Sequence, residues 1–413
     1  MTLNGARVLY ISYNGMLDPL GQSQVIPYLK QLNQRGVEFT LLSFERPEAL
    51  AQHDAEIERM RSDLAASGID WHWLRYHKTP SLPATSYDVF AGIRYGRRLM
   101  REKKIDLIHA RNHIAAVIAL RLKQRSGAKF IFDVRGLMAD EYVDAEHWQK
   151  DSLPYRITKS AERRALGAAE GIVTLTKRIW PIMTEWPVLQ NREVIHEVVP
   201  CCADLDLFRF NEDERRRRRS ELGFGNRFVI VYSGSIDGWY LTEKMADLFV
   251  AVQQQRSDAH FLWLTPSKHD RIRELMRARG SNDEQYTVVA AIPREVASYL
   301  SAADAGLAFI KPCFSKLASS PTKYAEYLGC GLPLLINAGV GDSDALITGE
   351  EVGALVADFN PDEYTRAWKQ IAQLTANPEG MRLRAREVAQ RLFDVRGVGL
   401  ERYARLYEQV LSG

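Results

Sequence analysis

The chain has 413 residues, of which 46% are hydrophobic and 26% are charged, and its formal net charge at pH 7 is +3. This length exceeds what one hydrophobic core usually supports, so we expect two domains. The small net charge gives no indication of a nucleic-acid partner, and we expect none. The four cysteines form no C-x-x-C pair, which favours reduced thiols over disulfides or a zinc site.

The N-terminal residues do not have the charged and apolar segments of a secretory signal. Charges interrupt every apolar stretch well before the ~18 residues that a membrane span needs. We therefore expect a cytoplasmic protein, and a peripheral position on the inner face of a membrane stays open.

The first half of the chain alternates short apolar runs with helix-length stretches. A β-rich run at 8–11 is followed by a helical pattern over 22–35, a stop at Gly36 and a second apolar run at 39–42. Similar runs recur at 107–109, 130–132 and 172–175. This alternation is typical of a parallel sheet with helices on both faces, so we expect residues 1–200 to form a Rossmann-like domain.

The second half repeats the alternation. Apolar runs at 228–232, 261–264, 287–289, 307–310 and 334–336 are separated by helical patterns. Residues 207–392 are therefore expected to form a second Rossmann-like domain. Two terminal helices are predicted at 381–397 and 400–411, and residues from about 395 to 413 are expected to pack back on the first domain.

Five consecutive arginines, Arg215–Arg219, follow Glu212, Asp213 and Glu214 on a predicted helix. Such a run could indicate a nucleic-acid patch. The adjacent acidic residues can pair with the arginines, so we interpret the helix as a solvated surface face.

The segment from Ser320 to Pro333 carries most of the chemistry. A serine N-cap, a proline at the first helical position and a glycine stop predict a short helix between two buried strands. The first N–H groups of such a helix form an anion site at the carboxyl edge of a parallel sheet. Lys323 lies in this first turn, where the helix dipole disfavours a cation unless an anion such as a diphosphate offsets it. Glu326 lies one turn further, at a height that suits ribose hydroxyls.

The alternative for this segment is an ordinary capped helix with an exposed Lys323–Glu326 pair. The pattern Ser-Pro-Thr-Lys-x-x-Glu-Tyr-x-x-x-Gly-x-Pro, however, resembles the donor-site helix of the family-4 retaining glycosyltransferases. Other landmarks of that family occur in the expected order, at 11–16, 18–24, 132–136 with 140–141, 200–204 and 232–235. The resemblance covers nearly the whole chain. It implies the GT-B fold, in which an acceptor-binding and a donor-binding Rossmann-like domain face a central cleft.

The resemblance also implies roles for single residues. Donor binding falls to Gly21, Gln22, Ser235, Ile292, Ser320, Thr322, Lys323 and Glu326. Among these, Glu326 would hold the ribose, Ser320, Thr322 and Lys323 the diphosphate side, and the turn at Ile292 the base. Catalysis falls to Asp133, Arg135 and Lys323. Apart from the resemblance, His109, Arg111 and Asn112 are candidates for the acceptor site because they follow the end of a predicted strand. Any one of these three acceptor candidates could instead be structural.

Three departures from the family pattern concern the sugar and the charge at the site. Ala318 stands where many members have a glutamate that contacts the donor sugar. The loop 234–239 has no arginine or lysine, so Lys323 or Arg135 would supply the positive charge. Asp133 ends a strand that often ends in histidine, and its carboxylate could accept an acceptor proton or orient the donor sugar.

The expected reaction is hexosyl transfer, with retained configuration, from a nucleoside-diphosphate sugar to a glycan, lipid-linked or small-molecule acceptor in polysaccharide or glycoconjugate synthesis. Asp204 and Asp206 have the Asp-x-Asp spacing of a metal site but fall in the interdomain linker, so we expect no metal and no cofactor. The rival interpretations are a sugar-nucleotide epimerase or phosphorylase on the same scaffold and a nucleotide-binding scaffold without catalysis.

Residues 88–104 carry Arg94, Arg97, Arg98, Arg101 and Lys104 along one helical stripe. Such a basic amphipathic helix can rest on an anionic membrane surface. The alternative is a solvated helix that packs its apolar side on the sheet.

Overall fold

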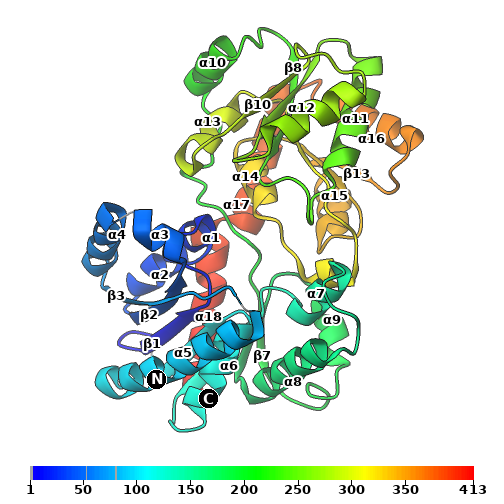
Figure 1. Cartoon of the computed structure of the whole chain (residues 1–413). Helices are drawn as coiled ribbons and strands as arrows, with labels where there is room; N and C mark the ends of the chain where they lie inside the picture. Colours follow the sequence, from blue (N-terminus) through cyan, green and yellow to red (C-terminus); the bar gives the residue numbers. More distant parts are fainter. Residues whose placement is uncertain (1–2, 53, 80) are drawn as a thin grey trace. The chain divides into compact units, whose positions relative to one another are not determined.

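The computed structural model describes residues 3–52, 54–79 and 81–413, and it divides the chain into two compact units (Figure 1). The first unit contains the chain up to Pro200 together with Val395–Gly413, and the second contains Cys201–Asp394. The chain therefore enters the second unit once and returns once. The two connecting segments pair with each other, because the Ala203 N–H donates to the Phe393 carbonyl at 2.9 Å.

The first unit is built on a seven-stranded parallel sheet with the order β3-β2-β1-β4-β5-β6-β7. Its strands are β1 (Arg7–Ser12), β2 (Glu38–Glu45), β3 (Ile69–Arg75), β4 (Leu107–Arg111), β5 (Lys129–Asp133), β6 (Gly171–Thr174) and β7 (Ile195–Val198). Most residues of these strands are buried because helices cover both faces of the sheet. The strand order reverses between β1 and β4.

Ten helices belong to the described part of the first unit. They are α1 (Pro19–Gln24), α2 (Ile26–Asn33), α3 (Pro47–Gln52), α4 (Asp54–Ala66), α5 (Ser81–Lys103), α6 (His113–Lys123), α7 (Met138–Asp144), α8 (Leu153–Ala168), α9 (Ile179–Thr184) and α18 (Glu401–Ser412). The prediction of one helix over 22–35 is wrong, because the helix breaks at Val25 and restarts with Pro27 in its first turn. Proline has no N–H to continue the preceding helix.

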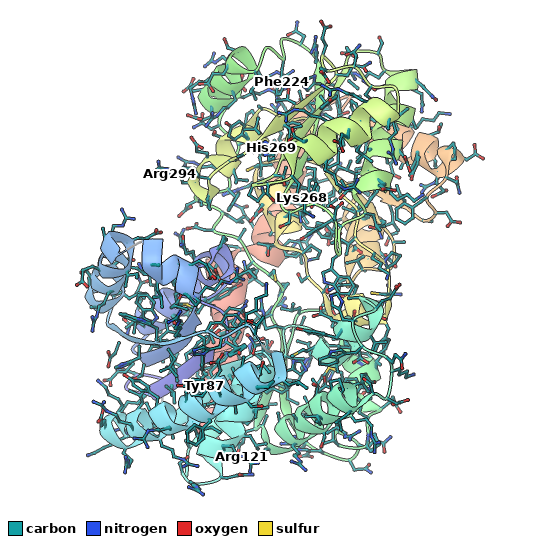
Figure 2. The ribbon with its side chains drawn as sticks, in the orientation of Figure 1. Tyr87, Arg121, Phe224, Lys268, His269 and Arg294 are labelled. Carbon is teal, nitrogen blue, oxygen red and sulfur yellow. The ribbon has the colours of Figure 1, made fainter. Side chains whose placement is uncertain are left out.

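Helix α5 packs on α6 through two glycines. A Cβ at Gly92 would lie 2.6 Å from Ile118 Cδ1, and one at Gly96 would lie 2.7 Å from Leu122 Cδ1. The outer side of the pair is exposed, with Tyr87 on α5 and Arg121 on α6 labelled in Figure 2. The apolar stripe thus faces the core, and the basic side chains of α5 face solvent.

The second unit has a six-stranded parallel sheet with the order β10-β9-β8-β11-β12-β13. Its strands are β8 (Phe228–Ser233), β9 (Ala259–Leu264), β10 (Tyr286–Val289), β11 (Ala305–Ala308), β12 (Leu334–Asn337) and β13 (Gly353–Val356). The strand order reverses between β8 and β11. Two parallel, helix-covered sheets confirm the predicted fold class.

The helices of the second unit complete the alternation. They are α10 (Glu212–Glu221), α11 (Thr242–Gln255), α12 (His269–Ala278), α13 (Val296–Ser301), α14 (Thr322–Gly329), α15 (Ser343–Glu350), α16 (Pro361–Leu374) and α17 (Pro378–Phe393). Short 3-10 turns occupy Pro293–Glu295 and Phe314–Ala318, and a π-helical segment, Val395–Leu400, leads from α17 to α18. Arg386 of α17 donates to the carbonyls of Phe208 and Gly329 at 2.7 and 3.0 Å, which fixes the end of α14.

The interpretation of Arg215–Arg219 as a solvated face holds for only part of the run. Arg216 and Arg217 form exposed ion pairs with Asp213 and Glu214. Arg215, Arg218 and Arg219 turn inward instead, and Arg218 stacks on the Tyr299 ring at 3.9 Å. Periodicity within one helix cannot reveal these partners, because they lie on α13 and the loop after it.

Candidate functional site

Each sheet has one place where its strand order reverses, and in open parallel sheets ligands bind in the crevice beside the carboxyl ends of the strands there. In the first unit this place lies between the ends of β1 and β4. In the second unit it lies between the ends of β8 and β11. Most of the candidate residues from the sequence follow strands at these two positions.

The start of α14 differs in one respect from the sequence prediction. The predicted N-cap, Ser320, lies outside the helix, and Pro321 takes that position without a side-chain cap. The Ser320 hydroxyl accepts a hydrogen bond from the Cys201 N–H at 3.1 Å. The serine is therefore used to attach the segment that enters the second unit, and the first N–H groups of α14, from Thr322 onward, lack a capping side chain.

Lys323 is buried against aromatic rings and has no carboxylate partner. Its side chain is 7% exposed, and its Nζ lies 3.8 Å from the centre of the Tyr240 ring and 5.3 Å from that of Tyr232. No ion pair or hydrogen bond of the described residues involves it. The alternative of an exposed Lys323–Glu326 pair is therefore wrong. Cation–π contact, worth roughly 0.5–2 kcal/mol, also offsets the unfavourable helix dipole before any ligand binds.

Glu326 lies one turn further along α14. No hydrogen bond or ion pair between described residues occupies its carboxylate. Burial raises the pKa of Glu326 to about 7, although the nearby charge of Lys323 acts in the opposite direction. A partly buried carboxylate without a partner can accept hydrogen bonds from a ligand, and it costs free energy to keep it charged without them.

The loop after β8 approaches Lys323 closely. Gly234 has a φ of +135°, and a Cβ added there would lie 3.3 Å from Lys323 Nζ. The Tyr232 hydroxyl donates to the carbonyl of the exposed Ser235. Only glycine combines this backbone conformation with such a short approach to the lysine.

A second lysine that the sequence analysis missed borders the same loop. Lys316 Nζ lies 3.7 Å from the centre of the Trp239 ring. The adjacent aromatic residues Trp239 and Tyr240 thus each cover one lysine, Lys316 and Lys323. The pair of aromatic residues in a loop of small residues was the available signal in the sequence. Ala318, two residues after Lys316, is 3% exposed and provides no polar group.

Ile292 lies further along the same sheet edge. It follows β10, which is separated from β8 by β9, and its side chain is 44% exposed before the turn Pro293–Glu295. Lys323 therefore lies close to Gly234 and to the loop that contains Ser235. The structure places Ile292 at the outer strand of the same sheet.

The candidates of the first unit form a buried charged cluster around Asp133, the last residue of β5. Asp133 Oδ2 lies 3.6 Å from His109 Nε2 and 3.7 Å from Arg111 Nη1, and Asp133 Oδ1 lies 3.9 Å from Arg135 Nε. The Tyr403 hydroxyl of α18 donates to Asp133 Oδ2 at 2.8 Å. The exposed fraction of Asp133 is 0%, so solvent does not reach the carboxylate.

The charges of this cluster are set by burial and by each other. Burial alone would raise the pKa of Asp133, but the charges and hydrogen bonds of Arg135, His109 and Arg111 lower it overall. Burial lowers the pKa of His109, whose Nδ1 lies 2.7 Å from the Tyr407 hydroxyl. Asp133 is therefore an anion and His109 a neutral imidazole at pH 7. His109 is 1% exposed, which encloses it beneath α18.

A cavity of about 310 Å³ opens above this cluster, at the reversal point of the first sheet. Asn112 and Arg135 line it together with Tyr13, Asn14 and Glu141. The Asn112 amide donates to Asn14 Oδ1 at 3.2 Å, which joins the loops that follow β4 and β1. His109 and Arg111 do not line the cavity. Among the three acceptor candidates, only Asn112 reaches it directly.

The loop after β1 is held by a carboxylate that the sequence analysis did not identify. Glu45 accepts hydrogen bonds from the N–H groups of Met16 and Leu17 at 2.7 and 3.2 Å. A Cβ at Gly21 would lie 2.2 Å from the Gly15 carbonyl, so this turn requires glycine. Gln22 donates to the Leu17 carbonyl at 3.3 Å and is exposed. Both donor-binding candidates of the first unit therefore belong to one tightly folded loop.

The described residues contain no group of three His, Cys, Asp or Glu side chains that could hold a metal ion. Asp204 accepts a hydrogen bond from the Asp206 N–H at 3.0 Å, so this Asp-x-Asp sequence forms a turn. In the described part of the chain, no helix is long and apolar enough to cross a membrane.

Comparison with known proteins gives a family match over the first unit. Residues 25–200 match the model of the glycosyl transferase 4-like domain. No curated protein matches the chain by sequence. Solved structures are similar over nearly the whole chain at low sequence identity, and they confirm the GT-B fold.

Three solved structures illustrate this likeness. Sucrose-phosphate synthase from Thermosynechococcus elongatus has a TM-score of 0.76 at 18% identity, with 98% of this chain and 99% of that chain covered. HepE from Anabaena, in complex with UDP and glucose, has a TM-score of 0.71 at 14% identity, with 99% and 100% covered. WaaG, a glycosyltransferase involved in lipopolysaccharide biosynthesis, has a TM-score of 0.67 at 14% identity, with 98% and 100% covered.

Proposed function

We propose that this chain, which has the GT-B fold and matches the glycosyl transferase 4-like domain at residues 25–200, is a glycosyltransferase that transfers a hexose with retained configuration and without a metal ion. In this proposal the second unit, over residues 207–392, binds a nucleoside-diphosphate sugar, and the first binds the acceptor. The observation that carries the proposal is the pair of unpartnered groups, Lys323 and Glu326, on one helix at the reversal point of the second sheet.

The leaving diphosphate needs positive charge and hydrogen-bond donors as the glycosidic bond breaks. Lys323 supplies a cation whose position is fixed by the Tyr240 ring. The uncapped N–H groups at the start of α14, at Thr322 and after it, add donors and the positive end of the helix dipole. Ser320 fixes the segment that precedes this turn. This arrangement supports Lys323 as the group that stabilises the departing phosphate.

The nucleoside would be held along the same edge. Glu326 is proposed to accept hydrogen bonds from the ribose hydroxyls, because its carboxylate has no partner in the described structure. The exposed turn at Ile292 would meet the base, and Ser235 would lie near the phosphates. Gly21 and Gln22, in α1 of the first unit, are also proposed to bind the donor. We propose uridine as the base, since HepE was solved with UDP.

In the first unit, the acceptor is proposed to enter the cavity of about 310 Å³ beside Asn112 and Arg135. Asp133 is enclosed, so it would act by holding Arg135 and Arg111 in place rather than by touching substrate. His109 would support the same cluster from below. Arg135 is then the cationic group of this unit that can face the reacting centre. The acceptor itself is proposed to be a glycan, a lipid-linked saccharide or a small molecule.

A lipid-linked acceptor would bring the protein to a membrane surface, and α5 offers a suitable face. Arg94, Arg97 and Arg101 are exposed along it, and the Phe90 side chain is 65% exposed. Basic residues beside an exposed aromatic ring favour anionic lipid. Sedimentation with anionic vesicles at low salt tests this: wild type should sediment and an R94E/R97E/R101E variant should not. Failure of the wild type to sediment would reject the membrane role.

One observation favours a second candidate function. Ala318 offers no polar contact to a donor sugar. A nucleotide-binding scaffold without catalysis would not need such a contact. Incubation with UDP-, GDP-, dTDP- and CDP-sugars separates the two. Sugar transfer to an acceptor, or slow hydrolysis of one donor, supports the transferase. Tight nucleotide binding without turnover supports the scaffold, and interconversion of two sugar nucleotides would instead support an epimerase.

A further inference from the structure

A large cavity of the second unit lies at the opposite edge of its sheet from Lys323 and Glu326. It has a volume of about 920 Å³. Its wall includes Arg227, Asp304 and Pro333, the residues that immediately precede β8, β11 and β12. The cavity is therefore at the amino ends of these strands, whereas the proposed donor site is at their carboxyl ends.

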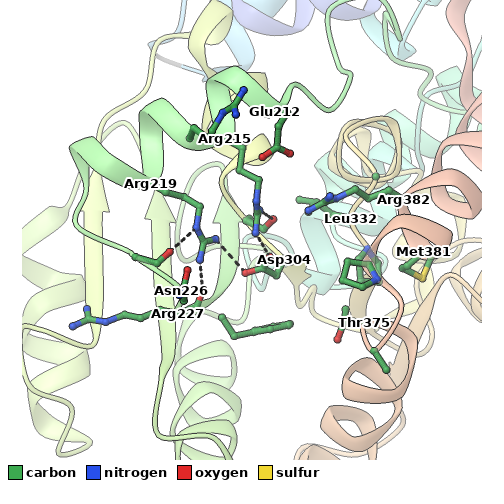
Figure 3. A pocket seen from close by; sticks show the side chains of 18 of the residues that line it. Glu212, Arg215, Arg219, Asn226, Arg227, Asp304, Leu332, Thr375, Met381 and Arg382 are labelled. Carbon is green, nitrogen blue, oxygen red and sulfur yellow. Dashed lines mark hydrogen bonds and ion pairs between the residues drawn. The ribbon is translucent and has the colours of Figure 1, made fainter.

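The wall of this cavity is strongly cationic. Two carboxylates, Glu212 and Asp304, face six arginines: Arg215, Arg216, Arg219, Arg227, Arg256 and Arg382. Figure 3 shows Arg215 and Arg219 directed toward Asp304, with Arg382 entering from the α17 side. The positive charge exceeds what the cavity's own carboxylates can neutralise.

Some of these arginines have structural partners. Arg215 donates to the carbonyls of Ser301 and Ala303 and to Asp304, at 3.1, 2.8 and 2.7 Å. Arg219 donates to the carbonyls of Gly225 and Ala302, at 3.0 and 2.8 Å. These two side chains satisfy the carbonyl groups at the end of α13 and the loop after it. Their presence is explained by the fold and needs no ligand.

Arg382 is different, because no hydrogen bond or ion pair between described residues involves it. Its guanidinium carbon lies 4.0 Å from the centre of the Phe210 ring, and its stem packs over Gly331, where a Cβ would lie 2.9 Å from Arg382 Cγ. Burial lowers the pKa of Arg382 and the charge of Arg215 lowers it further, although the charges of Asp304, Glu212 and Glu379 act in the opposite direction. A guanidinium fixed on both sides, half-buried and close to a like charge favours an anion as its partner.

We infer that this cavity is a second binding site of the protein, for a soluble phosphomonoester such as a sugar phosphate. The planar guanidinium of Arg382 would bind two phosphate oxygens in parallel. Arg216 can turn to the same anion at little cost, because its ion pair with Asp213 is 69% and 86% exposed and such pairs contribute about 0–1 kcal/mol.

The size of the cavity and its other wall residues indicate what the ligand carries besides the phosphate. The volume of about 920 Å³ lies within the range of roughly 300–1,000 Å³ that holds small organic ligands, so the cavity admits more than a phosphate ion. Phe228, Leu332 and Met381 give it apolar surface. Gly331, which contacts Arg382, lies in the loop directly after α14, and this helix carries Lys323 and Glu326 at the proposed donor site.

Calorimetry with inorganic phosphate and glucose 6-phosphate, in the presence of saturating UDP, tests the inference. Excess UDP keeps the phosphates out of the proposed donor site, and a K323A protein repeats the titration as an independent check of that separation. We expect both phosphates to bind, glucose 6-phosphate more tightly, and unphosphorylated glucose not to bind.

The variant R382A should weaken glucose 6-phosphate binding by about tenfold or more, since hydrogen bonds to charged groups are worth roughly 1.5–3 kcal/mol. R382K should bind with intermediate affinity, because a lysine keeps the charge but not the paired donors. R384A is the matched control on the same helix, because Arg384 is exposed, and it should bind like wild type. Circular dichroism of R382A checks that it is folded.

Two results would overturn the inference: no phosphate binding by the wild type up to millimolar concentrations, or equal losses in R382A and R384A. Neither depends on transferase activity. A protein that binds glucose 6-phosphate through Arg382 but fails to bind any nucleoside diphosphate would refute the proposed function and leave this site intact.

Discussion

The charged side chains at the carboxyl edges of the two sheets differ in their partners. In the first unit, Asp133 is enclosed by Arg111, Arg135 and His109 and accepts a hydrogen bond from Tyr403. In the second unit, Lys323 and Glu326 form no ion pair or hydrogen bond among the described residues, although the charge of Lys323 acts on the nearby Glu326 carboxylate. We propose that the buried charge cluster around Asp133 positions residues of the first unit, and that Lys323 and Glu326 on α14 remain available to a ligand. In this proposal Asp133 is a positioning residue, and Lys323 and Glu326 are binding residues.

The largest expected effect comes from removing the Asp133 carboxylate from its buried cluster. D133A leaves the two arginines facing each other without a counter-charge, and loss of one partner of a buried charge pair costs about 3–5 kcal/mol. We expect this loss in the free energy of unfolding of the first unit, measured in urea. E102A, at an exposed position on α5, should change it by about 0.5 kcal/mol or less. A D133A protein as stable as wild type would contradict a stabilising role of the Asp133 carboxylate in this cluster.

The second effect concerns Lys323 at the proposed donor site. K323A should lower turnover by roughly 10²–10³-fold, the loss typical of one preorganised group that stabilises charge in the transition state. The midpoint of thermal unfolding should change little, because the lysine forms no ion pair or hydrogen bond with another described residue. K268A, which removes an exposed lysine of the same unit, provides the control. Equal turnover in K323A and K268A would remove Lys323 from the mechanism.

The third effect is a pH dependence of nucleotide affinity. The pKa of Glu326 is raised to about 7 without ligand, so the carboxylate is mostly protonated at pH 6 and mostly ionised at pH 8. Ribose hydroxyls bind better to the ionised form, so UDP should bind about tenfold more weakly at pH 6 than at pH 8, following the population of that form. In E326Q the affinity should be lower and this pH dependence absent. A UDP affinity that is constant from pH 6 to 8 in wild type would contradict the role of Glu326.

The smallest effect sharpens the comparison within the first unit. Y407F removes one hydroxyl from His109 and leaves the charges of the cluster unchanged. The free energy of unfolding should fall by about 1 kcal/mol, the usual contribution of a single hydrogen bond. A loss as large as that of D133A would mean that the hydroxyl, rather than the charge balance, holds the cluster together.

The sequence was sufficient for the alternation of strands and helices and for the helix that carries Lys323 and Glu326. Hydrophobic periodicity is local, so it identifies elements well, and the donor-helix pattern is contiguous. The sequence allowed a ligand site or an exposed ion pair at Lys323 and Glu326, and burial of Lys323 against Tyr240 excludes the exposed pair. The sequence could not supply that burial, because the ring comes from a loop about eighty residues earlier in the chain.

The same limit explains the errors. Ser320 has every property of an N-cap, yet its hydroxyl contacts Cys201, more than a hundred residues away. Arg215 and Arg219 have acidic neighbours on their own helix but pair with Asp304 and carbonyls of the same region. Long-range polar contacts compete with local ones, and no spacing rule within one segment records them.

The return of the chain to the first unit has a consequence for synthesis. The seven strands of the first sheet are complete once β7 has been made, but Tyr403 and Tyr407 belong to α18, near the end of the described chain. While the second unit is being translated, Asp133 and His109 lack the hydroxyl groups that later enclose them. The first unit therefore cannot complete the burial of Asp133 and His109 until α18 has left the ribosome.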